Sequence, residues 1–306
     1  MRLAARGEIH HTAEAARRIL ANCELCPRRC HVNRLKGEVG QCRTGEVAVV
    51  SSHGPHFGEE APLVGTGGSG TIFFARCNLR CVFCQNHSIS QLGEGSEASS
   101  HDMAYMMLSL QRRGCHNINL VSPTHVVPQI LEALELAVAE GLHVPLVYNC
   151  GGYESVETLR LLDGIVDIYM PDMKYADSST AYEYSDVQNY AEINKAALKE
   201  MHRQVGDLQA DDRGVATRGL LVRHLVLPHG LAGTRKIVEF LANEVSSNTY
   251  VNVMAQYHPC HRAHDFPALS RAVTREEYLE AVTLALQNGL TRLDQLHYPR
   301  TARVSF

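Results

Sequence analysis

Seven of the ten cysteines fall into two tight groups whose spacing could support metal chemistry. The first group is Cys23, Cys26, Cys30 and Cys42, and the second is Cys77, Cys81 and Cys84. Closely spaced thiols in a reducing compartment are usually metal ligands rather than disulfide partners. The other three, Cys115, Cys150 and Cys260, stand alone in the sequence, and we expect them to behave as small buried hydrophobic residues.

The second group places three thiols within eight residues, directly after a predicted strand at 71–74. Iron–sulfur clusters take cysteine thiolate ligands, and three cysteines leave one iron of a four-iron cube open. An open iron can bind a reactant, just as catalytic zinc sites keep a vacant position. The alternative is a structural zinc knuckle with His87 as the fourth ligand. That alternative explains neither the barrel pattern nor the polar strand ends described below.

The first group supplies four thiols, which is enough to close either a zinc site or a [4Fe–4S] site. Sequence does not choose between these two metals. A segment as short as 1–65 cannot bury enough apolar surface to order itself, so we predict a small N-terminal module held together by metal. We favour a structural role for this metal over a redox role.

The rest of the chain, 66–306, alternates short strand-like runs with amphipathic helical patterns. Strands are predicted at 71–74, 117–121, 144–148, 166–170, 220–227 and 250–255, and helices at 102–112, 127–140, 156–162, 189–205, 234–245 and 275–288. Six strand–helix units predict an α/β fold with a parallel sheet. Six units rather than eight indicate a partial (β/α)6 barrel, whose chemistry lies at the carboxyl ends of the strands. Polar, Gly and Pro residues follow several of the predicted strands.

Composition argues against several classes of partner. The formal net charge is −4, and the Lys and Arg residues are scattered rather than grouped in runs that would favour binding to nucleic acid or to an anionic membrane surface. No run approaches the roughly 18 apolar residues of a membrane span, and the first residues lack the apolar core of a signal peptide. We therefore expect a cytoplasmic protein.

The pattern C-x3-C-x-Φ-C, with Phe83 as the apolar Φ, resembles the signature of the radical S-adenosylmethionine (SAM) superfamily, and the resemblance extends over about 68–260. Within the superfamily, the segments CELCPRRC (23–30), GTGGSGTIFF (65–74) and VSPTH (121–125) are similar to the PflX-like group, which is related to the pyruvate formate-lyase activating enzymes. The resemblance implies a [4Fe–4S] cluster on Cys77, Cys81 and Cys84, with SAM on the open iron. An electron from the cluster then cleaves SAM to methionine and a 5′-deoxyadenosyl radical.

The resemblance also implies a SAM pocket, carried over position by position. Superfamily members usually end the second barrel strand with Gly-Gly-Glu, which binds the SAM amino group, whereas this chain has Ser122 and Thr124 there. The third strand ends at Asn149 without the acid that activating enzymes carry, and Lys174 matches a lysine that approaches the SAM carboxylate. The complete set of expected SAM-binding residues is Phe83, Ser122, Thr124, Asn149, Lys174, Arg223 and His258.

Three functions follow as hypotheses. The first is an activating enzyme that abstracts hydrogen from a glycine of a partner protein and takes electrons from a donor such as a flavodoxin or a ferredoxin. The second is a radical SAM enzyme that modifies another peptide or a small metabolite. The third is a non-enzymatic iron–sulfur or zinc-binding module. The overall resemblance to activating enzymes favours the first.

Overall fold

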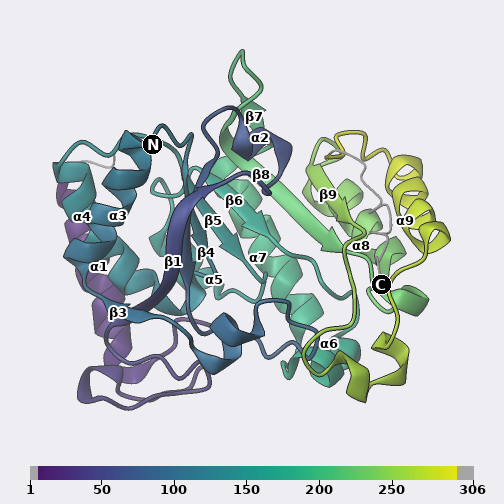
Figure 1. Cartoon of the computed structure of the whole chain (residues 1–306), viewed down its shortest axis with the longest axis horizontal. Coiled ribbons are helices and arrows are strands. Elements are labelled where there is room, and N and C mark those ends of the chain that lie inside the picture. Colours follow the sequence, from purple (N-terminus) through teal and green to yellow (C-terminus); the bar gives the residue numbers. More distant parts are fainter. Residues whose placement is uncertain (1–5, 295–306) are drawn as a thin grey trace, which may run out of the picture.

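The computed structural model describes residues 6–294, so residues 1–5 and 295–306, at the outer ends of the two predicted domains, lie outside the described residues. Its centre is a run of six parallel strands, which confirms the predicted α/β class (Figure 1). They pair in chain order and are β2 (Ser69–Phe74), β4 (Ile118–Val121), β5 (Leu146–Cys150), β6 (Ile168–Pro171), β8 (Ala216–Leu225) and β9 (Tyr250–Met254). Each overlaps one of the six strands expected from sequence.

The register of these strands brings their carboxyl ends to one edge of the sheet. Val121 of β4 lies opposite Phe73 of β2 and opposite Asn149 of β5. Asp172, just beyond β6, forms a parallel bridge with Arg223 of β8. Residues far apart in the chain therefore meet where parallel α/β folds place their ligands.

Three further strands add antiparallel pairs that the sequence pattern did not indicate. These are β1 (Ala48–His56), which pairs with β2, β3 (Ser96–Ala98), which pairs with β1, and β7 (Gln209–Ala210), which pairs with β8. Strand β1 contains Pro55, which is tolerated because β3 pairs only with residues 48–50 and leaves the rest of that side of β1 open. The predicted boundary at residue 65 thus falls between two strands of one sheet.

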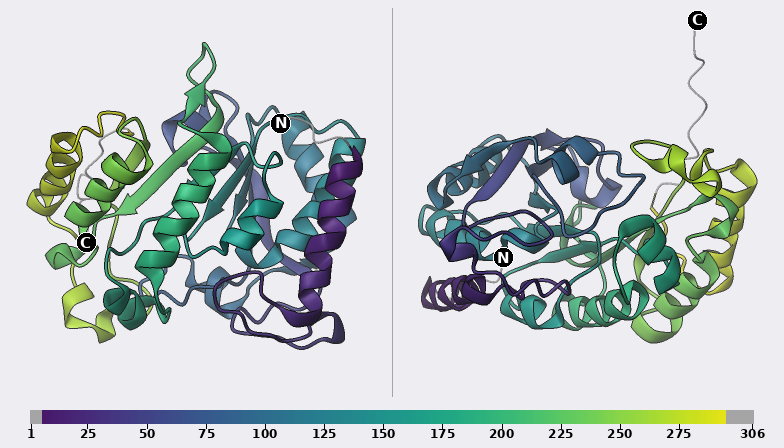
Figure 2. Two further views of the ribbon diagram at one scale, coloured as in Figure 1. Left: turned by 180° about the vertical axis from the view of Figure 1, so that it is seen from behind. Right: turned by 90° about the horizontal axis from the view of Figure 1, so that it is seen from below.

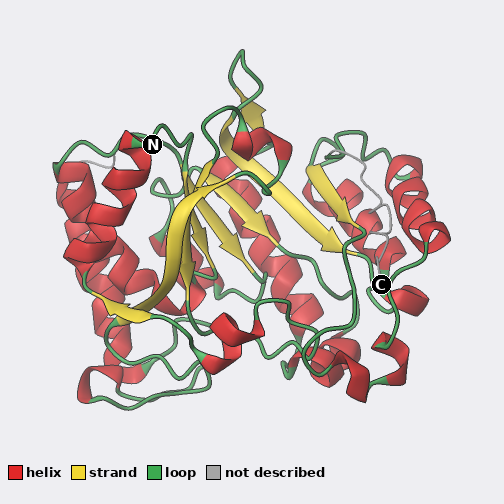
Figure 3. Ribbon diagram, viewed as in Figure 1, coloured by secondary structure: helices red, strands yellow, loops and turns green. Residues whose placement is uncertain are grey.

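Helices cover the outer face of the sheet, as the view from behind shows (Figure 2). The α-helices are α1 (Arg6–Ile19), α2 (Ala61–Val64), α3 (Ser100–Arg112), α4 (Val127–Ala139), α5 (Val156–Leu161), α6 (Ser178–Ser185), α7 (Tyr190–Val205), α8 (Thr234–Phe240) and α9 (Arg275–Gln287), of which the short α2 packs on the inner face instead. The colouring by element type shows them around the yellow strands (Figure 3). Capping boxes fix the starts of α3, through Ser99 and Asp102, and of α9, through Thr274 and Glu277. No helix among residues 6–294 combines the length and apolarity needed to cross a membrane.

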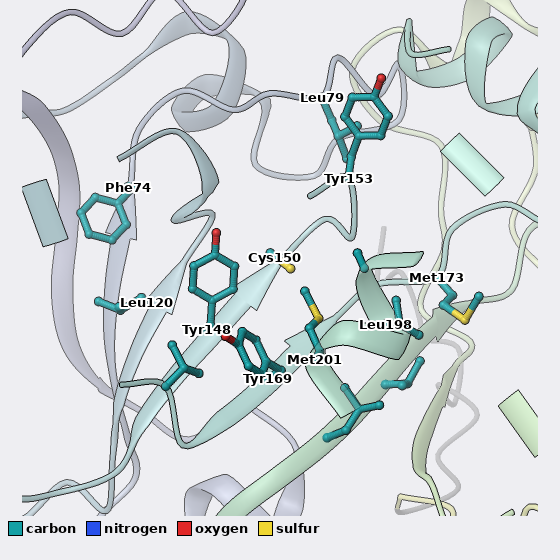
Figure 4. Close-up of a cluster of buried hydrophobic side chains, with 14 of the residues drawn as sticks. Phe74, Leu79, Leu120, Tyr148, Cys150, Tyr153, Tyr169, Met173, Leu198 and Met201 are labelled. Atoms are coloured by element: carbon teal, nitrogen blue, oxygen red, sulfur yellow. The ribbon is translucent and has the colours of Figure 1, made fainter. Parts of the chain in front are cut away.

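Alternation along the strands separates two cores. Tyr148 and Cys150 of β5 point to the helix side, where they pack with residues such as Met201 of α7 (Figure 4). Val147, one residue earlier than Tyr148, belongs to a smaller inner core that Leu63 of α2 covers. The sheet is thus packed on both faces, and the polar side chains that remain gather at the strand ends.

Candidate active site

The loop carrying Cys77, Cys81 and Cys84 begins where β2 ends. Arg76 has a left-handed backbone (φ 72°), which turns the chain out of the strand. All three cysteines line a cavity of about 790 Å³ that also takes side chains from the ends of β5, β6 and β8. The sequence-predicted cysteines and the predicted strand ends therefore share one cavity.

Each of the three sulfur atoms has a hydrogen-bonding group beside it. The Leu79 amide donates to Cys77 Sγ (3.4 Å), and the Ser185 hydroxyl donates to Cys81 Sγ (3.0 Å). The Ser90 hydroxyl lies 3.1 Å from Cys84 Sγ. Donors of this kind stabilise thiolates, the form in which cysteine binds metal. The donor set therefore fits a [4Fe–4S] cluster held by three thiolates.

Burial keeps the thiols of Cys77 and Cys81 protonated in the protein without metal. It raises the pKa of Cys77 to about 12 and also raises the pKa of Cys81. Iron would displace those protons, so loading of the site should release protons and favour higher pH.

Beside the cysteines lies a buried array of paired charges. Asp172 accepts hydrogen bonds from Lys174 Nζ (2.5 Å) and from Arg223 Nε (2.8 Å). Arg223 Nη2 also donates to Asn149 Oδ1 (2.7 Å). Strands β5 and β8 and the segment that follows β6 each contribute to this array, which the parallel register brings to the same end of the sheet.

The array is charged at neutral pH. Burial opposes ionisation of Asp172, but Arg223 and Lys174 outweigh it and hold the pKa of the carboxyl below its usual value. Burial likewise opposes the charge on Lys174, and Asp172 outweighs it, so the pKa of the lysine is raised. The opposite charges and their hydrogen bonds offset the cost of burying these groups and hold the charges of the cavity wall in fixed positions.

Two strand-end loops are held by Tyr190 of α7. Its hydroxyl donates to the carbonyl oxygen of Gly151 (2.9 Å) and accepts from the amide of Lys174 (3.2 Å). Gly152 follows with φ 76°, and a Cβ there would lie 2.2 Å from the carbonyl oxygen of Asp172. Glycine is therefore required where these loops touch.

The structure brings together most, but not all, of the sequence-predicted site residues. The cavity is lined by Cys77, Cys81, Cys84, Ser122, Asn149, Lys174 and Arg223. Phe83, Thr124 and His258 are not in its lining. Phe83 packs against the rings of Tyr175 and Tyr257, and His258 Nδ1 lies 3.4 Å from Gln85 Nε2. His87, the alternative zinc ligand, stacks on His261 with ring centroids 4.7 Å apart.

Ser122 and Thr124, the residues that stand in place of Gly-Gly-Glu, point to different environments. Ser122 lines the cavity with a left-handed backbone (φ 59°). Thr124 is buried and donates to Glu154 Oε1 (2.7 Å), and Glu154 Oε2 accepts from the Tyr148 hydroxyl (3.0 Å). Burial raises the pKa of Glu154 to about 7.

Sequence reasoning missed two acidic residues in the cavity wall, Glu59 and Glu60, which follow β1. Glu60 is 5% exposed; its Oε1 accepts from Asn252 Nδ2 (3.0 Å), while its Oε2 is buried with no partner among the described residues. Burial raises the pKa of Glu60, although Arg223 opposes the rise. The only sequence signal for Glu60 was its position just after β1, and the sequence pattern did not indicate that strand.

The N-terminal cysteines occupy a separate place. Cys23, Cys26, Cys30 and Cys42 line a second, smaller cavity, together with Asn78 and His125 from the barrel loops. Cys150 and Cys115 are buried, as expected for solitary cysteines, whereas Cys260 is half-buried and its Sγ lies 3.1 Å from the carbonyl oxygen of Phe83.

Comparison with known proteins agrees with this arrangement. Residues 71–204 match the model of the radical SAM superfamily. The chain is 35% identical to the uncharacterized protein MJ0674 of Methanocaldococcus jannaschii over 286 residues, which cover 90% of this chain and 78% of the relative.

The comparison with solved structures found matches at low sequence identity. A radical SAM methyltransferase from Sphaerobacter thermophilus is 13% identical, with a TM-score of 0.51, and the match covers 72% of this chain and 64% of the methyltransferase. This chain therefore spans less than two thirds of that enzyme. The FeFe-hydrogenase maturase HydG from Carboxydothermus hydrogenoformans is 12% identical, with a TM-score of 0.49, over 71% of this chain and 50% of HydG. Cysteine motif, parallel strands and family match agree, and the chain belongs to the radical SAM superfamily.

Proposed function

We propose that this protein is an activating enzyme that abstracts a hydrogen atom from a glycine in a partner protein. The observation that carries the proposal is the form of the cavity. Three thiols and the Lys174–Asp172 pair stand in it, and Phe57, which is 63% exposed, also belongs to its lining. An exposed aromatic ring at the rim offers a contact to a substrate that extends beyond the cavity, as a protein segment does.

In this proposal the three cysteines hold the [4Fe–4S] cluster that the family implies, and cluster and SAM together supply a 5′-deoxyadenosyl radical. Lys174, held by Asp172, presents its remaining N–H groups to the SAM carboxylate. Asn149 and Arg223 provide polar contacts at the neighbouring strand ends. Selectivity then depends on position, because such a radical attacks almost any nearby C–H bond.

The partner protein is proposed to be a glycyl radical enzyme, and the electron source a low-potential donor such as a flavodoxin or a ferredoxin. Support comes from the resemblance of the N-terminal and motif segments to activating enzymes. The test is to mix anaerobically reconstituted protein, SAM and reduced donor with a glycyl radical enzyme encoded in the same genome. We expect an electron paramagnetic resonance (EPR) signal from a glycine-centred radical in the partner.

The role of the rim is tested with a matched pair of variants. Phe57→Ala should lower radical formation in the partner while leaving SAM cleavage in its absence nearly unchanged. Leu279→Ala removes another exposed apolar side chain, on α9 and outside the cavity lining, and should change neither rate. Normal SAM cleavage with no radical in any partner, together with modification of a small metabolite, would replace this proposal by the metabolite hypothesis.

A further inference from the structure

The N-terminal cysteines form a built site whose occupant the radical SAM motif does not explain. The loop between α1 and β1 folds back on itself, with the Cys23 amide donating to the carbonyl oxygen of Val32 (3.0 Å) and the His31 amide donating to that of Cys23 (3.1 Å). Gly40 packs so closely that a Cβ there would lie 2.7 Å from Cys30 Sγ. The local chain thus encloses the four thiols.

The arrangement of the four thiols bears on what they can bind. Four sulfurs bound to one zinc at about 2.3 Å would stand only about 3.8 Å apart. Among residues 6–294, no three His, Cys, Asp or Glu side chains are arranged to hold a single metal ion, and this holds for Cys77, Cys81 and Cys84 as well. In this respect the N-terminal thiols resemble those of the motif, for which the family implies a cluster.

Arginine side chains line the cavity beside the four thiols. Arg34 is 1% exposed and donates to the carbonyl oxygens of Gly45 (2.7 and 2.9 Å) and His125 (2.9 Å), with Nη1 3.9 Å from Cys23 Sγ. No carboxylate among the described residues forms an ion pair with Arg34. Arg28 also lines the cavity, its Nη2 is buried without a hydrogen-bond partner, and its nearest ion-pair contact, Asp186, is 3.9 Å away.

The buried guanidinium of Arg34 needs a compensating negative charge. Four thiolates around a [4Fe–4S] core in its oxidised state carry a net charge of about −2, as they would around one zinc ion, so either occupant balances this arginine, and the arrangement of the thiols is what favours the cluster. Unused N–H groups facing the cavity can also bond to the sulfur atoms of a cluster, a contact that influences its reduction potential.

The cavity lies directly behind the radical SAM motif. Cys77 lines the barrel cavity, and the next residue, Asn78, lines the N-terminal one. Arg28 Nε donates to the carbonyl oxygen of Asn78 (2.7 Å), while Asn78 Nδ2 donates to that of Tyr153 (2.7 Å). The linings of the two cavities therefore meet at consecutive residues, Cys77 and Asn78.

We propose that Cys23, Cys26, Cys30 and Cys42 bind a second [4Fe–4S] cluster, redox-active and adjacent to the motif through Asn78. The cluster takes one electron from a one-electron reductant, which is oxidised, as its core passes from the 2+ to the 1+ state. This proposal goes beyond the proposed function, because it does not depend on the substrate of the enzyme.

The decisive protein is the full-length variant with Cys77, Cys81 and Cys84 all changed to Ala, prepared and reconstituted without oxygen. We expect about four irons and four sulfides per chain, and an EPR signal of a reduced cluster after addition of dithionite. Further change of Cys26 and Cys30 to Ala should remove both. One zinc per chain, or no metal at all, would overturn the proposal.

Measurements on wild-type protein give a second test, which does not depend on folding of the variants. It should contain roughly eight irons per chain and no stoichiometric zinc, whereas four irons with one zinc would contradict the proposal. When both clusters are reduced, its EPR spectrum should be broadened relative to the sum of the two single-cluster spectra. A spectrum equal to that sum would refute the adjacency through Asn78, and Cys115→Ala, a solitary buried cysteine, should match wild type.

Discussion

The two cysteine sites lie on either side of Asn78 and are built differently. The barrel site has three thiols in a wide cavity, where acid and base side chains pair with each other, as Asp172 does with Lys174. The N-terminal site has four thiols in a small cavity, where Arg34 has only carbonyl oxygens and a sulfur as partners.

This difference shows how charge is balanced in each place. In the barrel, acidic and basic side chains pair with each other, so a bound ligand meets paired charges in fixed positions and a vacant metal position. At the N-terminal site the guanidinium of Arg34 requires the occupant to supply the negative charge. One site is thus arranged for a reactant that comes and goes, and the other for a permanent resident.

The largest expected effect is a loss of function at the barrel site that leaves the N-terminal site intact. Cys81→Ala removes one of three ligands, so SAM cleavage should fall below detection, a loss of more than about 10³-fold. Metal at the N-terminal site should be unaffected in this variant. Product analysis of 5′-deoxyadenosine and metal analysis on the same sample check both parts. Full cleavage activity in Cys81→Ala would show that the barrel site has been misassigned.

The next effect tests the buried cation. Arg34→Met leaves the thiolates without their counter-charge and should destabilise the N-terminal region by about 3–5 kcal/mol. Metal retention there should fall, and residues 1–50 should become sensitive to protease while the barrel stays resistant. Arg34→Lys keeps the positive charge but loses the forked guanidinium, so its stability and metal content should lie between those of wild type and Arg34→Met. Lys36→Ala, an exposed neighbour, is the control, and equal metal content in all three variants would contradict this account.

The third effect concerns Glu154, which is buried and accepts hydrogen bonds from Thr124 and Tyr148. Burial raises its pKa from 4.5 to about 7, so the folded protein holds a proton that the unfolded chain releases between these pH values. Its contribution to stability is therefore present below about pH 4.5 and lost as pH rises to 7, by about 3 kcal/mol in total.

Urea unfolding at pH 5.5 and pH 8 measures this loss. Glu154→Gln should remove that part of the pH dependence, so its stability relative to wild type should rise between the two pH values. Glu157→Gln serves as control, because the hydrogen bond from Ser155 lowers the pKa of this exposed carboxyl. Parallel pH profiles for wild type and Glu154→Gln would show that Glu154 is ionised in the folded protein.

The smallest expected effect concerns SAM affinity. Lys174→Ala should weaken SAM binding by about 1.5–3 kcal/mol, or roughly 10- to 100-fold in Kd, because a charge-assisted contact is lost. His258→Ala should weaken it less, since His258 is outside the cavity lining. Lys236→Ala breaks a surface pair with Asp177 and should have no effect. Calorimetry decides, and unchanged affinity in Lys174→Ala would place the SAM carboxylate elsewhere.

Sequence predicted the parts of the molecule that follow from local patterns. Each of the six parallel strands overlaps a predicted strand, and the resemblance to the radical SAM superfamily supplied Asn149, Lys174 and Arg223, which line one cavity at the strand ends. Strand β1 was not predicted because it contains Gly54 and Pro55, residues that argue against a strand. Glu60, which follows β1, was therefore not predicted either. The roles of Arg34 and Glu154 depend on burial by distant segments, which no local pattern records.

The contacts of the N-terminal cavity also set an order of events during synthesis. Its lid includes Asn78 and His125, and the Thr158 hydroxyl donates to the carbonyl oxygen of Leu25 (2.9 Å). These partners leave the ribosome well after Cys42, on the order of ten seconds later at ordinary elongation rates. During that interval the four thiols are uncovered. Iron or another metal can reach the thiols during this interval, which ends when residue 158 has been synthesised.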